Sequence, residues 1–458
     1  MANRTKKEAA LTPEEKLQQA LVPVEEQPYP VPANWCWVSL DAICGMFQYG
    51  YTEKASFEKI GPHFIRITDI GDGIINDVKA PYCKINIEDY EKYKINKGDI
   101  LIARMGSVGE NGLAINDIEG VFASYLIRLV PRISSVFVRF YLQSPLYWSQ
   151  ITNKSQGTTR LNINANVLRK LLFPLPPLSE HQRIVARIES LFAKLDEVKE
   201  KAQAVVDGYE NRKAAILHKA FAGELTAKWR EEKKIYVKNW KCKFIREFCF
   251  VTKLAGFEYT KYIAPNLTDK GIPLFKGKNV QKGSLVLQFE SYIPKAISDE
   301  LQRSKLYRKC ILTPYVGTIG NVAIFDGSFE AHLGSNVGKI EINSDTFEEF
   351  LLHYLRSDFG YKELTKHKKA TAQESISIEA IRDVKVLLPS SQEQLEIVNC
   401  IEKLLAKEEQ VKSTAESVLD QIDTMKKSIL ARAFRGELGT NDPADEPAIE
   451  LLKRVKQE

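Results

Sequence analysis

The chain has 458 residues, of which 44% are hydrophobic and 27% charged, and its formal net charge is +6. We expect roughly two to four domains with buried cores, and neither a membrane-spanning segment nor a secretory signal, because no apolar run is long enough for either. The seven cysteines form no Cys-x-x-Cys pair and the six histidines no metal-ligand pattern, which favours reduced thiols, no metal site and a cytoplasmic location.

The first elements along the chain are a charged N-terminal arm, residues 1–30, and a globular domain, residues 31–177. The domain opens with Asn34-Trp-Cys-Trp and has a buried-strand signal that runs into the turn Gly106-Ser-Val-Gly109. It ends in the polar segment 157–164, Gly-Thr-Thr-Arg-Leu-Asn-Ile-Asn. Short β-rich runs punctuated by glycine, with a few helices, predict an α+β domain.

A long helix is predicted within residues 178–236. Pro-Leu-Pro-Pro-Leu precedes Ser179, with Gln182 three residues later, which fits a capping box after a proline break. Apolar residues then recur at alternating spacings of four and three, a heptad pattern typical of a coiled coil. The predicted interface positions are Ile184, Ile188, Leu191, Leu195, Val198 and Val205.

The second half of the chain repeats this plan. Residues 237–389 open with Asn239-Trp-Lys-Cys, contain the turn Gly317-Thr-Ile-Gly320 and a predicted helix at 347–355, and end in the polar segment 370–377. A second long helix, residues 390–438, follows, with a capping box predicted at Ser391 and Gln394. Its interface positions are Ile397, Ile401, Leu404, Val411, Val418 and Ile422, and residues 439–458 form an acidic tail.

The two long helices are an internal duplication. Residues 176–225 align with 389–438 without a gap, and both copies end in Ile-Leu-x-x-Ala-Phe-x-Gly-Glu-Leu, at 216–225 and 429–438. Matching heptads favour pairing of the two helices within one chain, and a two-fold relation between equivalent units makes the pair antiparallel. Two alternatives remain at this point: each helix packs on its own domain, or it drives dimerisation between chains.

Catalytic chemistry is not visible in the sequence. It has no Gly-x-Gly-x-x-Gly after a strand, no phosphate-binding loop, no Gly-x-Ser-x-Gly and no Asn/Asp-Pro-Pro-aromatic tetrapeptide. The two Gly-x-x-Gly turns could hold phosphates, although a tight turn that requires positive φ explains them more simply. The excess of basic residues lies between the acidic ends, and it is compatible with nucleic-acid binding.

Together these residues resemble the specificity subunit of type I DNA restriction-modification systems. The resemblance is carried by Pro-Leu-Pro-Pro-Leu-Ser-Glu-His-Gln-Arg-Ile-Val at 174–185, its echo at 388–398, the duplicated Ala-Phe-x-Gly-Glu-Leu endings, and Lys-Gly-Asp-Ile-Leu-Ile at 97–102. It covers nearly the whole chain outside the arm and the tail. The second copy departs from the first at Gln394 for His181 and Ala370 for Gly157.

The resemblance implies two target recognition domains, 31–177 and 237–389, each reading one half of a bipartite DNA sequence, and a helical pair that sets the gap. It implies a non-catalytic chain that binds no cofactor itself. Two modification subunits would use S-adenosylmethionine to methylate adenine after base flipping, and restriction endonuclease subunits would use ATP and Mg. The helix lysines Lys194, Lys199, Lys213, Lys407 and Lys412 are candidate docking positions.

Double-stranded DNA is therefore the predicted ligand. Base readout needs Arg, Asn, Gln or Thr side chains, and Lys suits phosphates. Two other interpretations remain open, a coiled-coil scaffold with two protein-binding heads and a diverged single-chain DNA methyltransferase. The candidate DNA-binding residues are Arg66, Arg104, Ser107, Thr158, Thr159, Arg160, Asn162, Asn164, Lys276, Lys278, Arg308, Tyr315, Thr318, Thr371 and Gln373.

Overall fold

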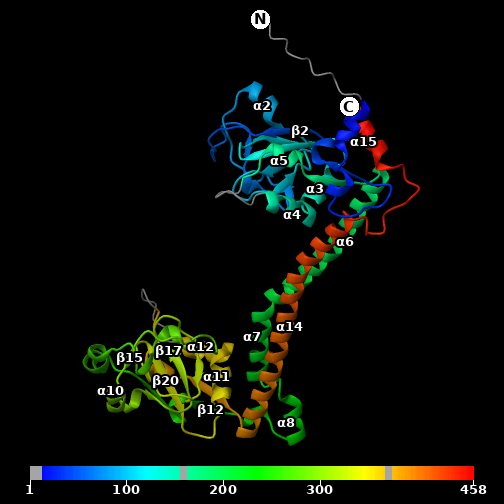
Figure 1. The fold of residues 1–458 in the computed structure, drawn as a ribbon. Helices are drawn as coiled ribbons and strands as arrows, with labels where there is room; N and C mark the ends of the chain where they lie inside the picture. Colours follow the sequence, from blue (N-terminus) through cyan, green and yellow to red (C-terminus); the bar gives the residue numbers. More distant parts are fainter. Residues whose placement is uncertain (1–12, 155–161, 367–373, 458) are drawn as a thin grey trace. The chain divides into compact units, whose positions relative to one another are not determined.

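The computed structural model describes residues 13–154, 162–366 and 374–457 (Figure 1). The chain divides into two compact units. The first unit comprises Met1–Lys201 and Ser417–Glu458, and the second comprises Ala202–Glu416. Each unit therefore contains one globular domain together with parts of both long helices. In the described part of the chain, no helix is both long and apolar enough to cross a membrane.

The first unit is built on a six-stranded sheet with the strand order β2-β10-β7-β8-β5-β4, beside a three-stranded sheet, β3-β9-β6, and a two-stranded sheet, β1-β11. Its elements are α1 (Pro13–Ala20), β1 (Cys36–Ser39), β2 (Cys44–Tyr49), β3 (His63–Ile65), β4 (Ile70–Gly71), β5 (Gly73–Ile75), α2 (Ile87–Tyr93), β6 (Lys94–Ile95), β7 (Ile100–Ala103), β8 (Asn111–Leu113), β9 (Ile118–Phe122), β10 (Leu126–Pro131), α3 (Ser135–Leu142), α4 (Pro145–Lys154), α5 (Ala165–Arg169), β11 (Leu172–Leu175) and α15 (Ala448–Gln457).

The second unit has two four-stranded sheets, β13-β20-β17-β18 and β15-β14-β19-β16, and a two-stranded sheet, β12-β21. Its elements are α7 (Tyr209–Phe221), α8 (Ala227–Lys233), β12 (Lys241–Phe244), β13 (Cys249–Lys253), α9 (Gly256–Glu258), β14 (Ile272–Phe275), β15 (Tyr292–Ile293), α10 (Lys295–Glu300), β16 (Lys305–Leu306), β17 (Cys310–Pro314), β18 (Ala323–Phe325), β19 (Ala331–Leu333), β20 (Val337–Ile342), α11 (Glu348–Arg356), α12 (Asp358–Thr365), α13 (Ile378–Arg382) and β21 (Lys385–Leu388).

The central strands show that the two domains are copies of one fold. In the first unit β10 lies between β2 and β7, and in the second β20 lies between β13 and β17, antiparallel in every case. The last residue of β7, Ala103, pairs with Leu126, just as Pro314 of β17 pairs with Val337. The predicted α+β duplication is confirmed, and the helix predicted at 347–355 is α11.

The first long helix is interrupted, whereas the second is not. Helix α6 (Leu178–Asp207) ends before Gly208 and α7 resumes at Tyr209, while α14 (Ser391–Ala433) continues without a break. Glycine costs about 1 kcal/mol in a helix interior, and α14 has Gln421 at the aligned position. The guanidinium of Arg212 donates to the Val205 carbonyl oxygen at 2.9 Å beside the break. The sequence predicted one helix here, and the glycine is the reason for the difference.

The two predicted capping boxes are wrong. Helix α14 begins at Ser391, but the capping hydroxyl belongs to Ser390, which accepts from the Glu393 amide at 3.3 Å. The side chain of Gln394 instead donates to the Pro389 carbonyl oxygen at 3.0 Å. Helix α6 begins one residue before Ser179, because the Pro177 carbonyl already accepts from the Glu180 amide at 3.0 Å.

The long helices run antiparallel where they meet. In the first unit Lys426 of α14 pairs with Asp196 of α6 at 2.5 Å, and the segment that follows α14 reaches Glu180, near the start of α6. In the second unit Arg212 of α7 pairs with Glu408 at 2.6 Å. Later residues of one helix thus face earlier residues of the other, as predicted.

The predicted heptad positions occupy three environments. Ile184 and Ile188 are fully buried in the globular core of the first unit, and Ile397 and Ile401 in that of the second, so each helix also packs on a domain. Ile422 is buried, whereas Val198 and Val411 are 45% and 48% exposed. Leu191, Leu195, Val205, Leu404 and Val418 are partly buried. In the first unit an open apolar groove of about 320 Å³ is lined by Leu191, Lys194, Leu195, Val198, Met425, Ser428 and Ile429.

The repeated Ala-Phe-x-Gly-Glu-Leu ending places an aromatic ring in each core. At the end of α14, Phe434 packs with Phe137 and Tyr141 of α3, with ring centroids 5.2 and 5.7 Å apart. At the end of α7, Phe221 packs with α11 in the same way, 5.5 Å from Phe350 and 5.2 Å from Tyr354. Each helix end therefore joins the domain that precedes the other long helix.

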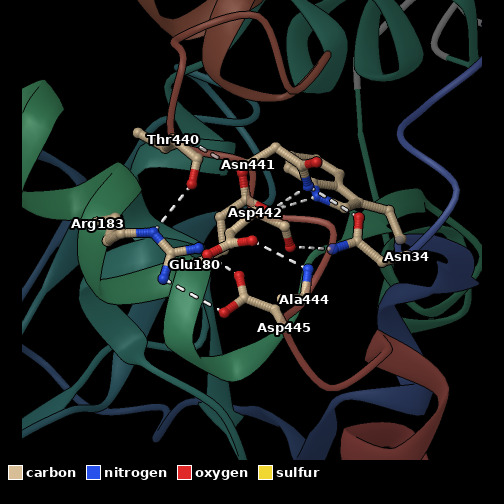
Figure 2. Close-up of polar contacts among 9 residues, drawn as sticks. Asn34, Glu180, Arg183, Thr440, Asn441, Asp442, Ala444 and Asp445 are labelled. Atoms are coloured by element: carbon tan, nitrogen blue, oxygen red, sulfur yellow. Dashed lines mark hydrogen bonds and ion pairs between the residues drawn. The ribbon is translucent and has the colours of Figure 1, made fainter.

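A buried glutamate near the start of each long helix completes the same connection. Glu180 is fully buried and accepts from the Trp35 indole nitrogen at 2.7 Å, the Thr440 hydroxyl at 3.0 Å and the Asn441 amide at 2.9 Å. Figure 2 shows the acidic tail folded around Glu180, with Arg183 paired to Asp445. The tail is thus part of the first unit.

The second glutamate repeats this arrangement with one change. Glu393 is fully buried and accepts from the Trp240 indole at 3.0 Å and the Thr226 hydroxyl at 3.0 Å. It also forms a buried ion pair with Arg230 of α8, at 2.7 Å. The amide donor Asn441 in the first unit is therefore replaced by a cation in the second.

The first unit should lose stability in acid through His181. This ring is buried and stacked on Phe137, with centroids 4.5 Å apart, and burial lowers the pKa of His181 from 6.5 to about 4. The unfolded residue takes up a proton near pH 6.5 and the folded one only near pH 4. The free energy of unfolding of the first unit should therefore contain the whole contribution of neutral His181 above pH 6.5. It should fall by about 3 kcal/mol as the pH drops to 4.

Denaturation of each unit between pH 4 and 7, followed by hydrogen exchange, checks this expectation. His181→Gln, which copies Gln394 at the aligned position of the second unit, should flatten the profile of the first unit. The second unit should keep its own acid sensitivity, because burial also lowers the pKa of His353 to about 4. An unchanged first-unit profile in the variant would exclude His181 as the cause.

Candidate nucleic-acid interface

Three segments of the first unit meet where β7 ends. The strand runs into Arg104, whose guanidinium lies over the ring of Tyr49, the last residue of β2, 4.8 Å from its centroid. The Ile163 amide donates to the Arg104 carbonyl oxygen at 3.1 Å, and the Ala165 amide donates to the Tyr49 hydroxyl at 3.1 Å. These bonds attach Ile163, at the end of the polar segment 157–164, and Ala165, which follows it, to the ends of β7 and β2 in the six-stranded sheet.

The second unit has the same junction at the end of β17. This strand runs into Tyr315, and the ammonium of Lys253, the last residue of β13, lies 4.6 Å from the centroid of its ring. The Ile376 amide donates to the Tyr315 carbonyl oxygen at 2.9 Å, and the Gly317 amide to that of Glu374 at 2.9 Å. The described end of the polar segment, residues 374–377, is therefore anchored in the same place.

The Gly-x-x-Gly turns beside these junctions have the ordinary role of glycine. Gly106, Gly109, Gly317 and Gly320 all have positive φ, between 70° and 91°. A Cβ on Gly320 would lie 2.3 Å from the Tyr361 ring, so a larger residue would also clash there. A tight turn accounts for all four glycines without a bound phosphate.

A short 3-10 turn lies next to each glycine turn. In the first unit Arg66 precedes the turn Ile67–Asp69 and pairs with Asp69 at 2.9 Å. In the second, Lys276 precedes the turn Gly277–Asn279, and its amide donates to the Asn279 side chain at 2.9 Å. Arg66 and Lys276 thus occupy equivalent places near the junctions, although the charge of Arg66 is partly neutralised.

The remaining predicted residues are distributed unevenly. Ser107, Asn162 and Thr318 are exposed at or beside the junctions, and the Asn164 side chain caps α5 by accepting from the Val167 amide at 3.0 Å. Lys278 pairs with Glu290. Arg308 precedes β17, at the strand end opposite Tyr315, and pairs with Glu341, so the structure does not bring it to the junction. Thr158, Thr159, Arg160, Thr371 and Gln373 lie outside the described residues.

Sequence reasoning did not find Tyr49 and Lys253. They lie at equivalent positions, since Tyr49 pairs with Ile127 of β10 and Lys253 with Gly338 of β20, one residue beyond Leu126 and Val337. Their flanking sequences share little beyond a cysteine that begins each strand. Only a strand-by-strand alignment of the two domains would have identified them.

The chain thus consists of two copies of one α+β domain, each followed by a long helix and each with a cation over a ring at its junction. Residues 33–206 and 238–417 match the type I restriction modification DNA specificity domain. The chain belongs to this family. Membership assigns it recognition rather than catalysis, as the sequence predicted, and favours neither the scaffold nor the methyltransferase alternative.

Relatives of similar length align along most of the chain. It is 26% identical over 454 residues to the type I restriction enzyme EcoBI specificity subunit of Escherichia coli, covering 93% of this chain and 92% of the relative. It is 27% identical over 416 residues to the EcoKI specificity subunit of Escherichia coli strain K12, covering 86% and 88%. The crystal structure of the HsdS subunit from Thermoanaerobacter tengcongensis shares the fold, with a TM-score of 0.64, 19% identity, and coverage of 90% of this chain and 100% of that one.

Proposed function

We propose that this chain is the DNA-recognition subunit of a type I restriction-modification complex, in which each domain reads one half of a bipartite target. The observation that carries the proposal is the pair of equivalent junctions, which share a backbone but differ in chemistry. A common scaffold suits binding to a common duplex, and different side chains suit different base sequences. Two readers joined in one chain bind strongly only when both half-sites are present at the right spacing.

The long helices would set that spacing and dock two modification subunits. The apolar groove between α6 and α14 in the first unit supports docking, because Val198 and Met425 are 45% and 47% exposed there. Lys213 and Lys412 are less available, since both lie over the Tyr209 ring, 4.7 and 4.9 Å from its centroid. S-Adenosylmethionine would be used by the modification subunits, and ATP with Mg by endonuclease subunits, rather than by this chain.

Expression of the chain with its modification subunit in a bacterium that lacks DNA methylation tests the proposal. Single-molecule sequencing should reveal one new motif made of two different halves, with methyladenine on opposite strands. Absence of any new modification, with both proteins shown to be present and assembled, would contradict the proposal. Single-residue changes at the two junctions should alter different halves.

Binding of the assembled complex to its target should also weaken steeply with salt. Each phosphate neutralised by a lysine or arginine releases counterions, so the logarithm of the binding constant should fall with the logarithm of salt concentration by about 0.9 per contact. Fluorescence titrations from low to physiological salt measure this slope. A salt-independent affinity would favour a protein-binding scaffold instead.

A further inference from the structure

The junctions of the two units hold the same kind of pair with the partners exchanged. In the first unit the cation, Arg104, follows β7 and the ring, Tyr49, ends β2. In the second unit the ring, Tyr315, follows β17 and the cation, Lys253, ends β13. Strand register makes the positions equivalent. Tyr49 pairs with the second residue of β10, and Lys253 pairs with the second residue of β20. Arg104 directly follows the residue that pairs with the first residue of β10, and Tyr315 directly follows the residue that pairs with the first residue of β20.

Within the described ranges, neither Arg104 nor Lys253 forms an ion pair with a carboxylate. Arg66 and Arg308, by contrast, pair with Asp69 and Glu341. The Nε of Arg104 is buried and also lacks a hydrogen-bond partner in those ranges. Tyr49 is 40% exposed and Lys253 is exposed, so the pairs can be reached from solvent. A cation that is held against a ring and lacks an anionic partner suits a ligand that supplies hydrogen-bond acceptors.

We propose that these stacked pairs, Arg104 with Tyr49 and Lys253 with Tyr315, are the base-reading pairs of the two units, and that exchanging the partners makes the two half-sites different. The proposal rests on the proposed function. A guanidinium held over a ring keeps donors free at its edge and can bind the O6 and N7 acceptors of guanine with two hydrogen bonds. Arg104 therefore reads a guanine in its half-site.

The second unit presents a different donor. The Lys253 ammonium is a compact charge without the planar fork of arginine, and it reaches the ring from the strand on the other side of β20. It tolerates more arrangements of acceptors than Arg104 does. The half-site read by the second unit should therefore differ at the contacted base, although the two backbones match.

Selection from a pool of duplexes tests the proposal. The assembled complex of this chain with its modification subunits selects from DNA randomised in both halves, and the bound sequences are scored separately for each half. Arg104→Ala and Tyr49→Ala should relax one half only, and Lys253→Ala and Tyr315→Ala the other half only. Discrimination at the guanine read by Arg104 should fall by about 5- to 150-fold.

Matched controls remove stacked cations elsewhere in each unit. Arg435 lies over Tyr29, 5.3 Å from its centroid, in the first unit, and Lys385 lies over Phe244 at 5.9 Å in the second. Arg435→Ala and Lys385→Ala should leave both halves unchanged. Arg104→Lys removes the planar fork and Lys253→Met removes the ammonium, and both preserve most of the packing. Each should still change the preference in its own half, so they decide the question if an alanine variant proves misfolded by circular dichroism.

Three results separate the possibilities. If the junction variants keep the preferences of the unaltered protein in both halves, the pairs do not read bases and the proposal is overturned. A uniform loss of affinity for all sequences, without a change in preference, overturns it as well, because it indicates phosphate contacts. If the unaltered complex selects no bipartite motif, the proposed function itself fails.

Discussion

Replacing Glu393 with glutamine is expected to destabilise the second unit by about 3–5 kcal/mol, the usual cost of removing one partner of a buried ion pair. The carboxylate is fully buried, and its closest cation, Arg230, has a side chain only 8% exposed. Glutamine removes the charge that Arg230 faces. It also turns an amide donor toward either the Trp240 indole or the Thr226 hydroxyl, both of which donate to Glu393 now.

The equivalent change in the first unit should cost less. Glu180 receives three hydrogen bonds, all from the neutral donors Trp35, Thr440 and Asn441, and it forms no ion pair within the described ranges. Glu180→Gln leaves one or two unsatisfied donors, at about 1–3 kcal/mol. The larger loss expected for Glu393→Gln follows from Arg230, since the indole and hydroxyl donors are the same in both units.

Urea denaturation followed by hydrogen exchange measures each unit separately. Glu393→Gln should reduce protection in β17 and β20 while leaving β7 and β10 unchanged. The exposed Glu402, on the same helix, provides a matched control, because Glu402→Gln should change stability by less than about 0.5 kcal/mol. Equal losses for Glu393→Gln and Glu402→Gln would show that the buried network contributes nothing specific.

The duplication predicted two domains and two long helices that run antiparallel, because heptads and repeated residues are local in sequence. It did not predict which contacts the repeated residues make. Glu180 and Glu393, the tryptophans at 35 and 240, and the phenylalanines at 221 and 434 appear in both copies, yet their contacts join residues far apart in the chain. Tertiary contacts of this kind have no periodic signal.

The candidate interface was predictable in part for the same reason. Glycine turns and polar segments mark the ends of strands, so Arg104 and Tyr315 could be found beside Gly106 and Gly317. Their ring and cation partners come from a strand that is not adjacent in sequence, and only the sheet order brings them together. Arg308 was misplaced because sequence distance from the glycine turn does not reveal which end of β17 it occupies.

The acidic tail should be required for the stability of the first unit, and Leu452→Ala should lower it by about 2–5 kcal/mol. Leu452 of α15 is fully buried, and it belongs to the same core as Phe137 and Ile184. The guanidinium of Arg132 also donates to the Val455 carbonyl oxygen at 2.9 Å. Thermal denaturation and hydrogen exchange of β7 and β10 measure the loss, and Lys453→Ala, on the exposed side of α15, should have almost no effect.

Removal of residues 439–458 should have a larger effect than Leu452→Ala and should still spare the second unit. The deletion takes away the buried side chains of α15 and, in addition, the Thr440 and Asn441 donors of Glu180. The second unit obtains the corresponding donors, Thr226 and Arg230, from the segment that leads from α7 into its own domain, so it does not need a tail. A truncated chain whose first unit keeps the protection of the full-length protein would contradict this role.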